Sequence, residues 1–121
     1  MALDVKFYEK ENGDVPVMSY LLSLDAKMRA KVFSEIELLE KHGFELKEPY
    51  VKAIKGKRYK GIYEQRIRLA SNLSRIFYFV YEQNTFVLLH GFTKKTDTTP
   101  ERELLHALRY RDDYERRSEN E

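Results

Sequence analysis

The sequence contains no cysteine, no tryptophan and no long hydrophobic run. Because cysteine is absent, the chain can form no disulfide and offers neither a thiol nucleophile nor a thiolate metal ligand. This composition fits a reducing compartment. No apolar segment reaches the ~20 residues that a membrane-spanning helix needs, and charges throughout the N-terminal segment leave no hydrophobic core of a signal peptide. These absences predict a soluble, cytoplasmic protein without a membrane partner.

Several kinds of enzyme site are absent as well. The chain has no glycine-rich phosphate loop and no Gly-x-Ser-x-Gly turn, and its three histidines lack metal-ligand spacing. Paired carboxylates are scarce, because Glu64 is the only acidic residue between Glu48 and Glu82. The sequence therefore predicts neither a metal nor a cofactor. An enzyme built on this chain would work mainly with cations.

The composition is that of one folded domain over residues 1–121. Hydrophobic residues make up 42% and aromatic residues 13% of the chain, which excludes general disorder. A chain of 121 residues can bury one core without disulfides. No repeat, linker or low-complexity segment divides it. Only the highly charged end, about residues 114–121, is expected to fray.

The net charge of +2 conceals an uneven distribution. Residues 1–45 have a net charge of −3 and residues 101–121 of −2, whereas residues 46–100 have a net charge of +7. A basic middle segment between acidic ends is typical of a surface that binds a polyanion. The alternative is an ordinary solvated face with scattered charges.

The first half of the chain predicts one strand and two helices. Asp4–Tyr8 alternates apolar and charged residues, as a strand does. Asp14 and Pro16 suit the start of a short helix, and Asp25 suits the start of a second one. The second helix has an apolar stripe at helical spacing, made of Met28, Val32, Ile36 and Leu39. An αα-hairpin over about residues 15–42 is expected.

The second half predicts an antiparallel meander. A short strand near Val51–Ile54 precedes three strand candidates joined by turns: Ile62–Ala70, Ser74–Tyr81 and Thr85–Thr93. Thr99 as cap and Pro100 in the first turn predict the start of a C-terminal helix. The expected fold is α+β, with the αα-hairpin packed on one face of the meander and the other face partly open.

That open face is expected to collect cations. Side chains alternate along a strand, so residues two apart share one face at a separation of about 7 Å. On this basis three adjacent strands present five side chains to one region: Arg66, Arg68, Arg75, His90 and Lys94. Routine outward polar alternation is the other interpretation. Against it, Glu64 is the only nearby counter-charge, so the like charges repel one another until an anion binds.

The loop before the meander is a second basic cluster. Four cations lie within six residues around one aromatic residue, and they are Lys55, Lys57, Arg58 and Lys60. They could follow an RNA backbone or form an ordinary solvated loop. The residues alone leave both interpretations open.

Four short motifs occur in order along the second half of the chain. They are Tyr63-Glu64-x-Arg66, Arg75-Ile76-x-Tyr78, His90-Gly91-Phe92-x-Lys94-Lys95-Thr96 and Thr99-Pro100-Glu101. Together they resemble the phage-derived Gp49-like, HigB-type toxins of the RelE/ParE superfamily, which belong to type II toxin–antitoxin systems. Val15–Val17 and Leu39–Gly43 extend the likeness to the first half, whereas Gln65 departs from the leucine that is usual there. The resemblance implies a RelE-like fold.

The resemblance also implies an activity, that of a ribosome-dependent mRNA endonuclease (an mRNA interferase) that needs no metal. In such an enzyme the RNA 2′-OH attacks the neighbouring phosphate, and basic residues do the work of a fixed acid–base pair. The catalytic residues that the motifs imply are Arg66 and Arg75 on the phosphate, with His90 or Lys94 moving protons. The further RNA contacts are Lys55, Lys57, Arg58, Lys60, Arg68 and Lys95.

The partners that the resemblance implies are the ribosome, its mRNA and a cognate antitoxin. The antitoxin is expected to be HigA-like, with a helix-turn-helix domain, and operator DNA is contacted only through the antitoxin complex. An acidic antitoxin segment could neutralise the cations, or a neutral or basic antitoxin could dock on the apolar stripes of the helical side. ParE-type relatives poison DNA gyrase instead, so a gyrase-binding toxin stays open, as does a plain RNA-binding module.

Overall fold

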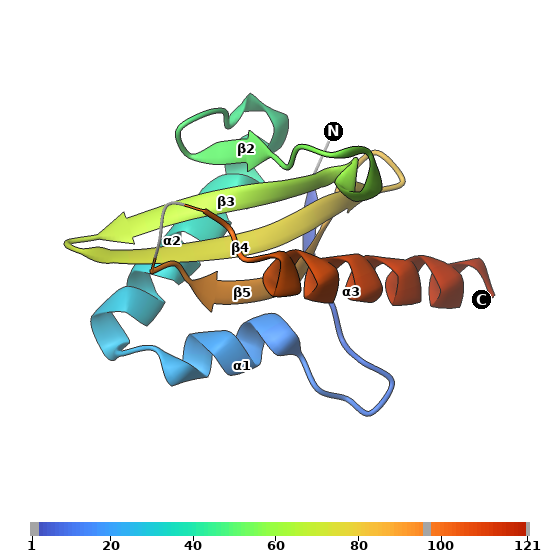
Figure 1. Cartoon of the computed structure of the whole chain (residues 1–121), viewed down its shortest axis with the longest axis horizontal. Coiled ribbons are helices and arrows are strands. Elements are labelled where there is room, and N and C mark those ends of the chain that lie inside the picture. The colour runs from blue at the N-terminus through green and yellow to red at the C-terminus, as the bar shows by residue number, and fades with distance from the viewer. Residues whose placement is uncertain (1–2, 96–97, 121) are drawn as a thin grey trace.

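Helices cover both faces of one mixed sheet in the computed structural model, which describes residues 3–95 and 98–120 (Figure 1). Within these residues the sheet has five strands in the order β1-β5-β4-β3-β2. The strands are β1 (Asp4–Phe7), β2 (Val51–Ala53), β3 (Ile62–Leu69), β4 (Asn72–Tyr81) and β5 (Thr85–Thr93). The helices are α1 (Pro16–Ser23), α2 (Ala26–His42) and α3 (Glu101–Glu119), with short 3-10 turns η1 (Gly43–Glu45) and η2 (Lys57–Tyr59).

The predicted meander is present, but the sheet as a whole is not antiparallel. β3, β4 and β5 pair antiparallel in sequence order, and β2 adds an antiparallel edge to β3. β1 pairs in parallel with β5, so that Asp4 lies opposite Thr85 and Phe7 opposite Leu88. Pairing between the first and last strands joins segments about 80 residues apart, and local sequence patterns do not specify it.

The first face of the sheet packs against α1 and α2, which are separate helices joined by Leu24 and Asp25. The predicted stripe of α2 is buried on this face together with Val17 and Leu21 of α1. The sheet contributes alternate residues to the same core: Ile67, Ile76, Tyr78, Phe86 and Leu88. The apolar stripes of the two helices are therefore already occupied by the sheet.

The second face is partly covered by α3, whereas the sequence predicts helices on one side only (Figure 1). Ala107, Leu104 and Leu108 of α3 pack against a second core on β4 and β5. The residues of that core include Phe77, Phe79, Val87 and Leu89. Because consecutive residues of β4 are apolar, both of its faces need cover, as in a central strand buried on two sides.

Pro16 begins α1 as the sequence predicts, but the predicted side-chain cap forms at only one of the three helix starts. The Asp25 Oδ1 atom accepts a hydrogen bond from the backbone N–H of Met28 at 2.8 Å, as an N-cap does. Asp14 instead accepts from Asn12 at 3.2 Å, and α1 begins after Val15 without a side-chain cap. The hydroxyl of Thr99 does not cap α3 either; it donates to Glu64.

α3 runs to Glu119, whereas the sequence predicts fraying from about residue 114. The Tyr8 hydroxyl donates to Asp113 at 2.5 Å, and Arg117 pairs with the same carboxylate at 2.7 Å. Arg117 also donates to the backbone carbonyl of Glu9. These contacts fasten the end of α3 to the segment after β1. In residues 3–95 and 98–120, no helix combines the length and apolar character needed to cross a membrane.

Candidate functional site

Glu64 is the centre of the predicted cation cluster and is only 2% exposed. Its Oε1 atom lies 3.2 Å from Arg66 Nε and 3.0 Å from Arg75 Nε. Its Oε2 atom accepts a hydrogen bond from the Thr99 hydroxyl at 3.1 Å. One buried carboxylate thus joins β3, β4 and the segment that leads into α3. The sequence predicts Glu64 only as the one nearby counter-charge; in the structure it pairs with two of the predicted arginines.

The strand register explains why these side chains meet. Arg66 on β3 lies directly opposite Arg75 on β4, and Glu64 lies two residues before Arg66 on the same face, opposite Phe77. Arg75 is 8% exposed. Burial lowers the pKa of Arg75, the Glu64 carboxylate raises it again, and the charges of Arg66 and Arg68 lower it further. Two arginines side by side are stable here because the Glu64 carboxylate pairs with both.

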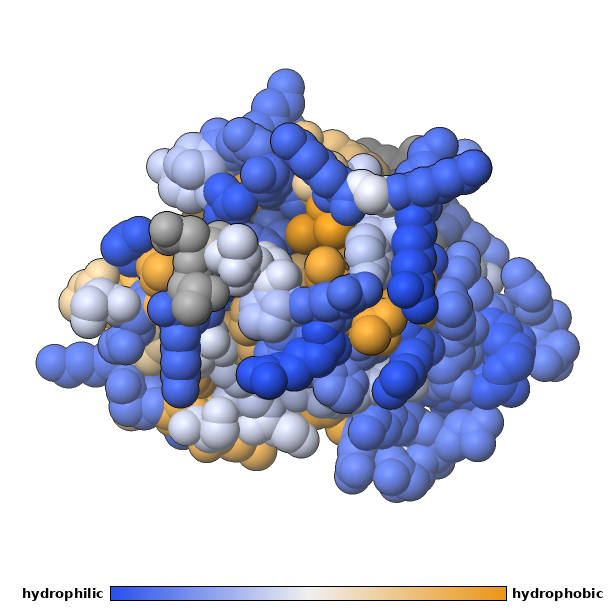
Figure 2. Space-filling model, viewed as in Figure 1, coloured by the Kyte–Doolittle hydropathy of each residue, from blue (hydrophilic) through white to orange (hydrophobic). Residues whose placement is uncertain are grey.

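A groove of about 480 Å³ lies beside this cluster, between the β2 edge and the start of α3. We call it the cationic groove. Among the described residues, its charged lining consists of Lys52, Lys55, Glu64, Arg66 and Lys94. Its other lining residues are Ala53, Ile54, Thr98, Thr99 and Leu104. Figure 2 shows this face from the α3 side, with a hollow that exposes an apolar floor among hydrophilic side chains.

A second groove, of about 360 Å³, lies on the other side of Arg66. We call it the arginine groove. It is lined by Lys31, Glu35, Pro49, Tyr50, Arg66, Ile67, Arg68, Leu73 and Arg75. Four of the five side chains that the sequence assigns to one face, Arg66, Arg68, Arg75 and Lys94, therefore line two neighbouring grooves, and Arg66 belongs to both.

The two lysines after β5 lie at the mouth of the site. The backbone N–H of Lys94 donates to the carbonyl of Leu73 at 2.7 Å, which continues the pairing of β5 with β4 beyond Thr93. Lys95 is exposed, and with Lys94 it lines a smaller hollow next to Arg102 and Glu103. Thr96 of the third motif lies outside the described residues.

His90 lies on the same face as the arginines but under α3. Its side chain is 15% exposed, and its Nε2 atom lies 3.1 Å from Glu103 Oε1. Its ring packs against Phe77 and His106, with ring-centroid distances of 6.4 and 5.0 Å. Burial lowers the pKa of His90, although Glu103 opposes the shift. His90 lines neither of the two grooves among the described residues.

The basic loop is attached to α3 and not extended into solvent. Arg58 Nη1 lies 4.0 Å from Glu101 Oε1, and the Tyr59 hydroxyl donates to the same carboxylate at 3.4 Å. The carbonyl of Lys60 accepts from Arg111 at 2.9 Å. Lys55 lines the cationic groove, and the side chains of Lys57, Arg58 and Lys60 are exposed beside it.

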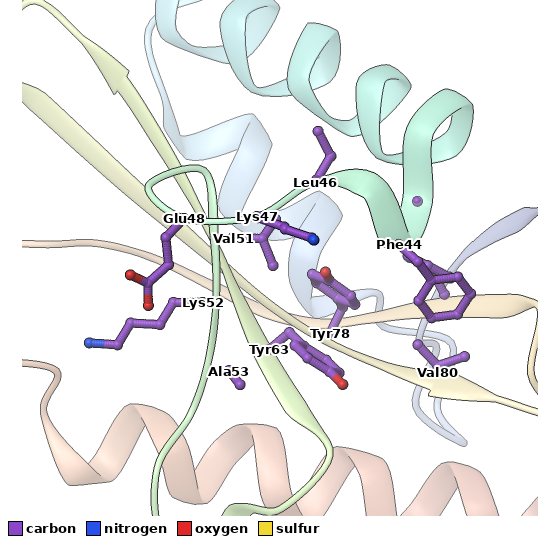
Figure 3. Close-up of a pocket in the computed structure, with 12 residues that line it drawn as sticks. Phe44, Leu46, Lys47, Glu48, Val51, Lys52, Ala53, Tyr63, Tyr78 and Val80 are labelled. Carbon is purple, nitrogen blue, oxygen red and sulfur yellow. The ribbon is translucent and has the colours of Figure 1, made fainter.

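An apolar pocket of about 310 Å³ opens on the opposite, α2 side of the sheet (Figure 3). Its lining includes Phe44, Leu46, Val51, Tyr63, Tyr78, Val80 and Phe86. The Tyr63 and Tyr78 rings stack at a centroid distance of 5.5 Å, while Phe44 remains 59% exposed. Lys47 extends toward Tyr78 in Figure 3, whereas Glu48 and Lys52 point away from the rings. Sequence reasoning missed this pocket because its walls come from four separate segments.

Comparison with protein-family models matches residues 19–112 to the family described as phage derived protein Gp49-like. The matched segment contains both grooves' arginines, Lys94 and most of α3. No curated protein matches the chain.

Proposed function

The chain belongs to the phage-derived Gp49-like family, whose members are commonly toxin-like components of toxin–antitoxin systems, and from this premise we propose that it is a HigB-type toxin of the RelE/ParE superfamily. On this proposal it is a metal-independent mRNA interferase that cleaves mRNA on the ribosome. The observation that carries the proposal is the buried Glu64 carboxylate that holds Arg66 and Arg75 beside two open cationic grooves.

For this cleavage reaction the protein has to supply mainly positive charge and alignment of the RNA. RNA supplies its own nucleophile, the 2′-OH next to the scissile phosphate, and the ribosome supplies part of the alignment. Arg66 and Arg75 stabilise the charge that develops on the phosphate. Each such contact is worth about 3 kcal/mol, or roughly a hundredfold in rate.

Proton transfer is assigned to Lys94, because it lines the cationic groove next to Arg66. His90 is the other candidate that the motifs imply. Its 15% exposure and its contact with Glu103 favour a positioning role, in which it holds the start of α3 over β5. On this proposal the basic loop contacts the RNA backbone. Lys55 lines the cationic groove, and the side chains of Lys57, Arg58 and Lys60 are exposed, which supports this role.

Inducing the chain in bacteria and mapping mRNA 5′ ends during the arrest tests this function. We expect growth and translation to stop, with new 5′ ends inside translated reading frames and not in untranslated RNA. Arrest without new mRNA ends would overturn the nuclease proposal. Gyrase-linked DNA breaks in the same cells would favour the ParE-like alternative, and RNA binding without either outcome would favour a plain RNA-binding module.

The antitoxin is proposed to dock on the α2 side and exclude the toxin from the ribosome. Docking on the apolar stripes of the helices is one of the two alternatives that the sequence leaves open, and these stripes are buried against the sheet. The apolar pocket and the exposed Phe44 ring are apolar features of that side, as are the exposed Leu22 of α1 and Leu38 of α2. The +7 charge of residues 46–100 favours the alternative, an acidic segment across the cations, so the two modes need a direct test.

Antitoxin affinity is expected to survive loss of the cations. We suggest replacing Arg66, Arg68 and Lys94 by alanine, which leaves Arg75 to pair with Glu64. Steric docking predicts near-wild-type affinity for this variant at low and high salt, and at least tenfold weaker binding for Phe44→Ala, about the cost of losing one interface anchor. Direct neutralisation predicts the reverse, with a steep salt dependence. A folded triple variant that no longer binds would exclude steric docking.

A further inference from the structure

We propose that Tyr50 is a base-stacking residue, and that a single strand of RNA crosses both grooves over Arg66. This inference rests on the proposed function and names how that site holds its substrate. It assigns the arginine groove as a second RNA-binding site, next to the cationic groove.

The position of Tyr50 is the first observation. Its side chain lines the arginine groove and is 60% exposed, which is unusual for a large ring with apolar surface. Its backbone carbonyl accepts a hydrogen bond from the backbone N–H of Arg66 at 2.8 Å. Tyr50 is therefore held directly beside the arginine that both grooves share. Among the described residues, no ring-stacking or cation–π contact occupies its face.

The spacing of the arginines is the second observation. Arg66 and Arg68 lie on one face of β3, two residues and about 7 Å apart. This separation is comparable to that of successive phosphates along an extended RNA strand. Guanidinium groups bind phosphate through a planar pair of N–H donors. A strand that places neighbouring phosphates on Arg66 and Arg68 passes alongside Tyr50.

The charge in the arginine groove is compatible with this path. Glu35 is the groove's one acidic lining residue among those described, and its Oε1 atom is paired with Lys31 Nζ at 2.8 Å. The cations Lys31, Arg66, Arg68 and Arg75 thus outnumber it. Every nucleobase offers a flat face to an aromatic ring, and such stacking is worth about 1–3 kcal/mol per base. An exposed tyrosine among cations fits single-stranded nucleic acid better than it fits an apolar protein partner.

The test measures binding of a fluorescein-labelled single-stranded oligoribonucleotide whose 2′-O-methyl sugars prevent cleavage. Tyr50→Ala should weaken binding by about five- to hundredfold, the loss of one stacked base. Tyr50→Phe keeps the ring and should bind as the wild type does. The matched control is Leu22→Ala, which removes a similarly exposed apolar side chain of α1 (65% against 60%) that lines neither groove and should change nothing.

The salt dependence of oligonucleotide binding distinguishes a stacking contact from a charge contact. Tyr50→Ala should leave the dependence of log affinity on log salt concentration unchanged. Arg66→Ala should make this dependence shallower, by about the amount that one phosphate contact contributes. Wild-type affinity in Tyr50→Ala, or equal losses in Tyr50→Ala and Tyr50→Phe, would overturn the assignment of Tyr50 and leave the proposed function standing. A wild-type protein that neither binds the oligonucleotide nor cleaves mRNA would overturn the proposed function itself. Circular dichroism of each variant shows that the fold is retained.

Discussion

Removing the guanidinium of Arg66 should abolish the toxicity of this protein. Arg66→Ala deletes a phosphate-binding group that lines both grooves, and the expected loss in cleavage rate is about a hundredfold or more. The Arg66 side chain is 28% exposed, so its loss should leave the fold intact. The measurement is colony formation on induction, followed by the rate of mRNA cleavage on purified ribosomes.

Arg75 needs a different substitution because it is largely buried against Glu64. Arg75→Lys keeps a positive charge near the carboxylate but loses the planar fork that binds phosphate at two points. It should therefore lower cleavage strongly at small cost to stability. Arg109→Ala is the control, since Arg109 is an exposed arginine of α3 that lines neither groove. Full toxicity from folded Arg66→Ala and Arg75→Lys proteins would refute the assignment of these residues.

Replacing Glu64 by alanine should destabilise the protein more than any other single loss of charge in the site. Glu64 is 2% exposed, and its removal leaves Arg75, also nearly buried, without a counter-charge. Breaking a buried ion pair costs about 3–5 kcal/mol of unfolding free energy. Because Arg66 remains partly hydrated, the lower end of that range is expected. Glu64→Gln should cost less, since an amide oxygen can still accept from Thr99.

Urea denaturation of matched variants measures this difference. Glu101→Ala removes a glutamate that also faces an arginine, but this pair is exposed and its atoms are 4.0 Å apart. Such surface pairs contribute about 0–1 kcal/mol. We therefore expect a large shift in the urea midpoint for Glu64→Ala and little shift for Glu101→Ala. Equal shifts for the two variants would show that Glu64 does not stabilise the cluster.

Much of the architecture could be predicted from the sequence because it depends on local periodicity. Alternation along β3 placed Arg66 and Arg68 on one face and Ile67 on the other, and the structure confirms this. The same reasoning placed the stripe of α2 in the core and Asp25 at its start. Short turns between β3, β4 and β5 predicted the meander. In each case the controlling interactions lie within a few residues of one another.

The tertiary structure alone decided how these pieces form a site. The parallel pairing of β1 with β5, the packing of α3 over His90 and the contact of Thr99 with Glu64 all join segments distant in sequence. The order of residue types along the strands was enough to determine that several cations share one face of the sheet. Which of them became buried, paired or open to a ligand depended on where α3 and β2 closed over that face, because burial and charge pairing are properties of the packed neighbours and not of the local chain.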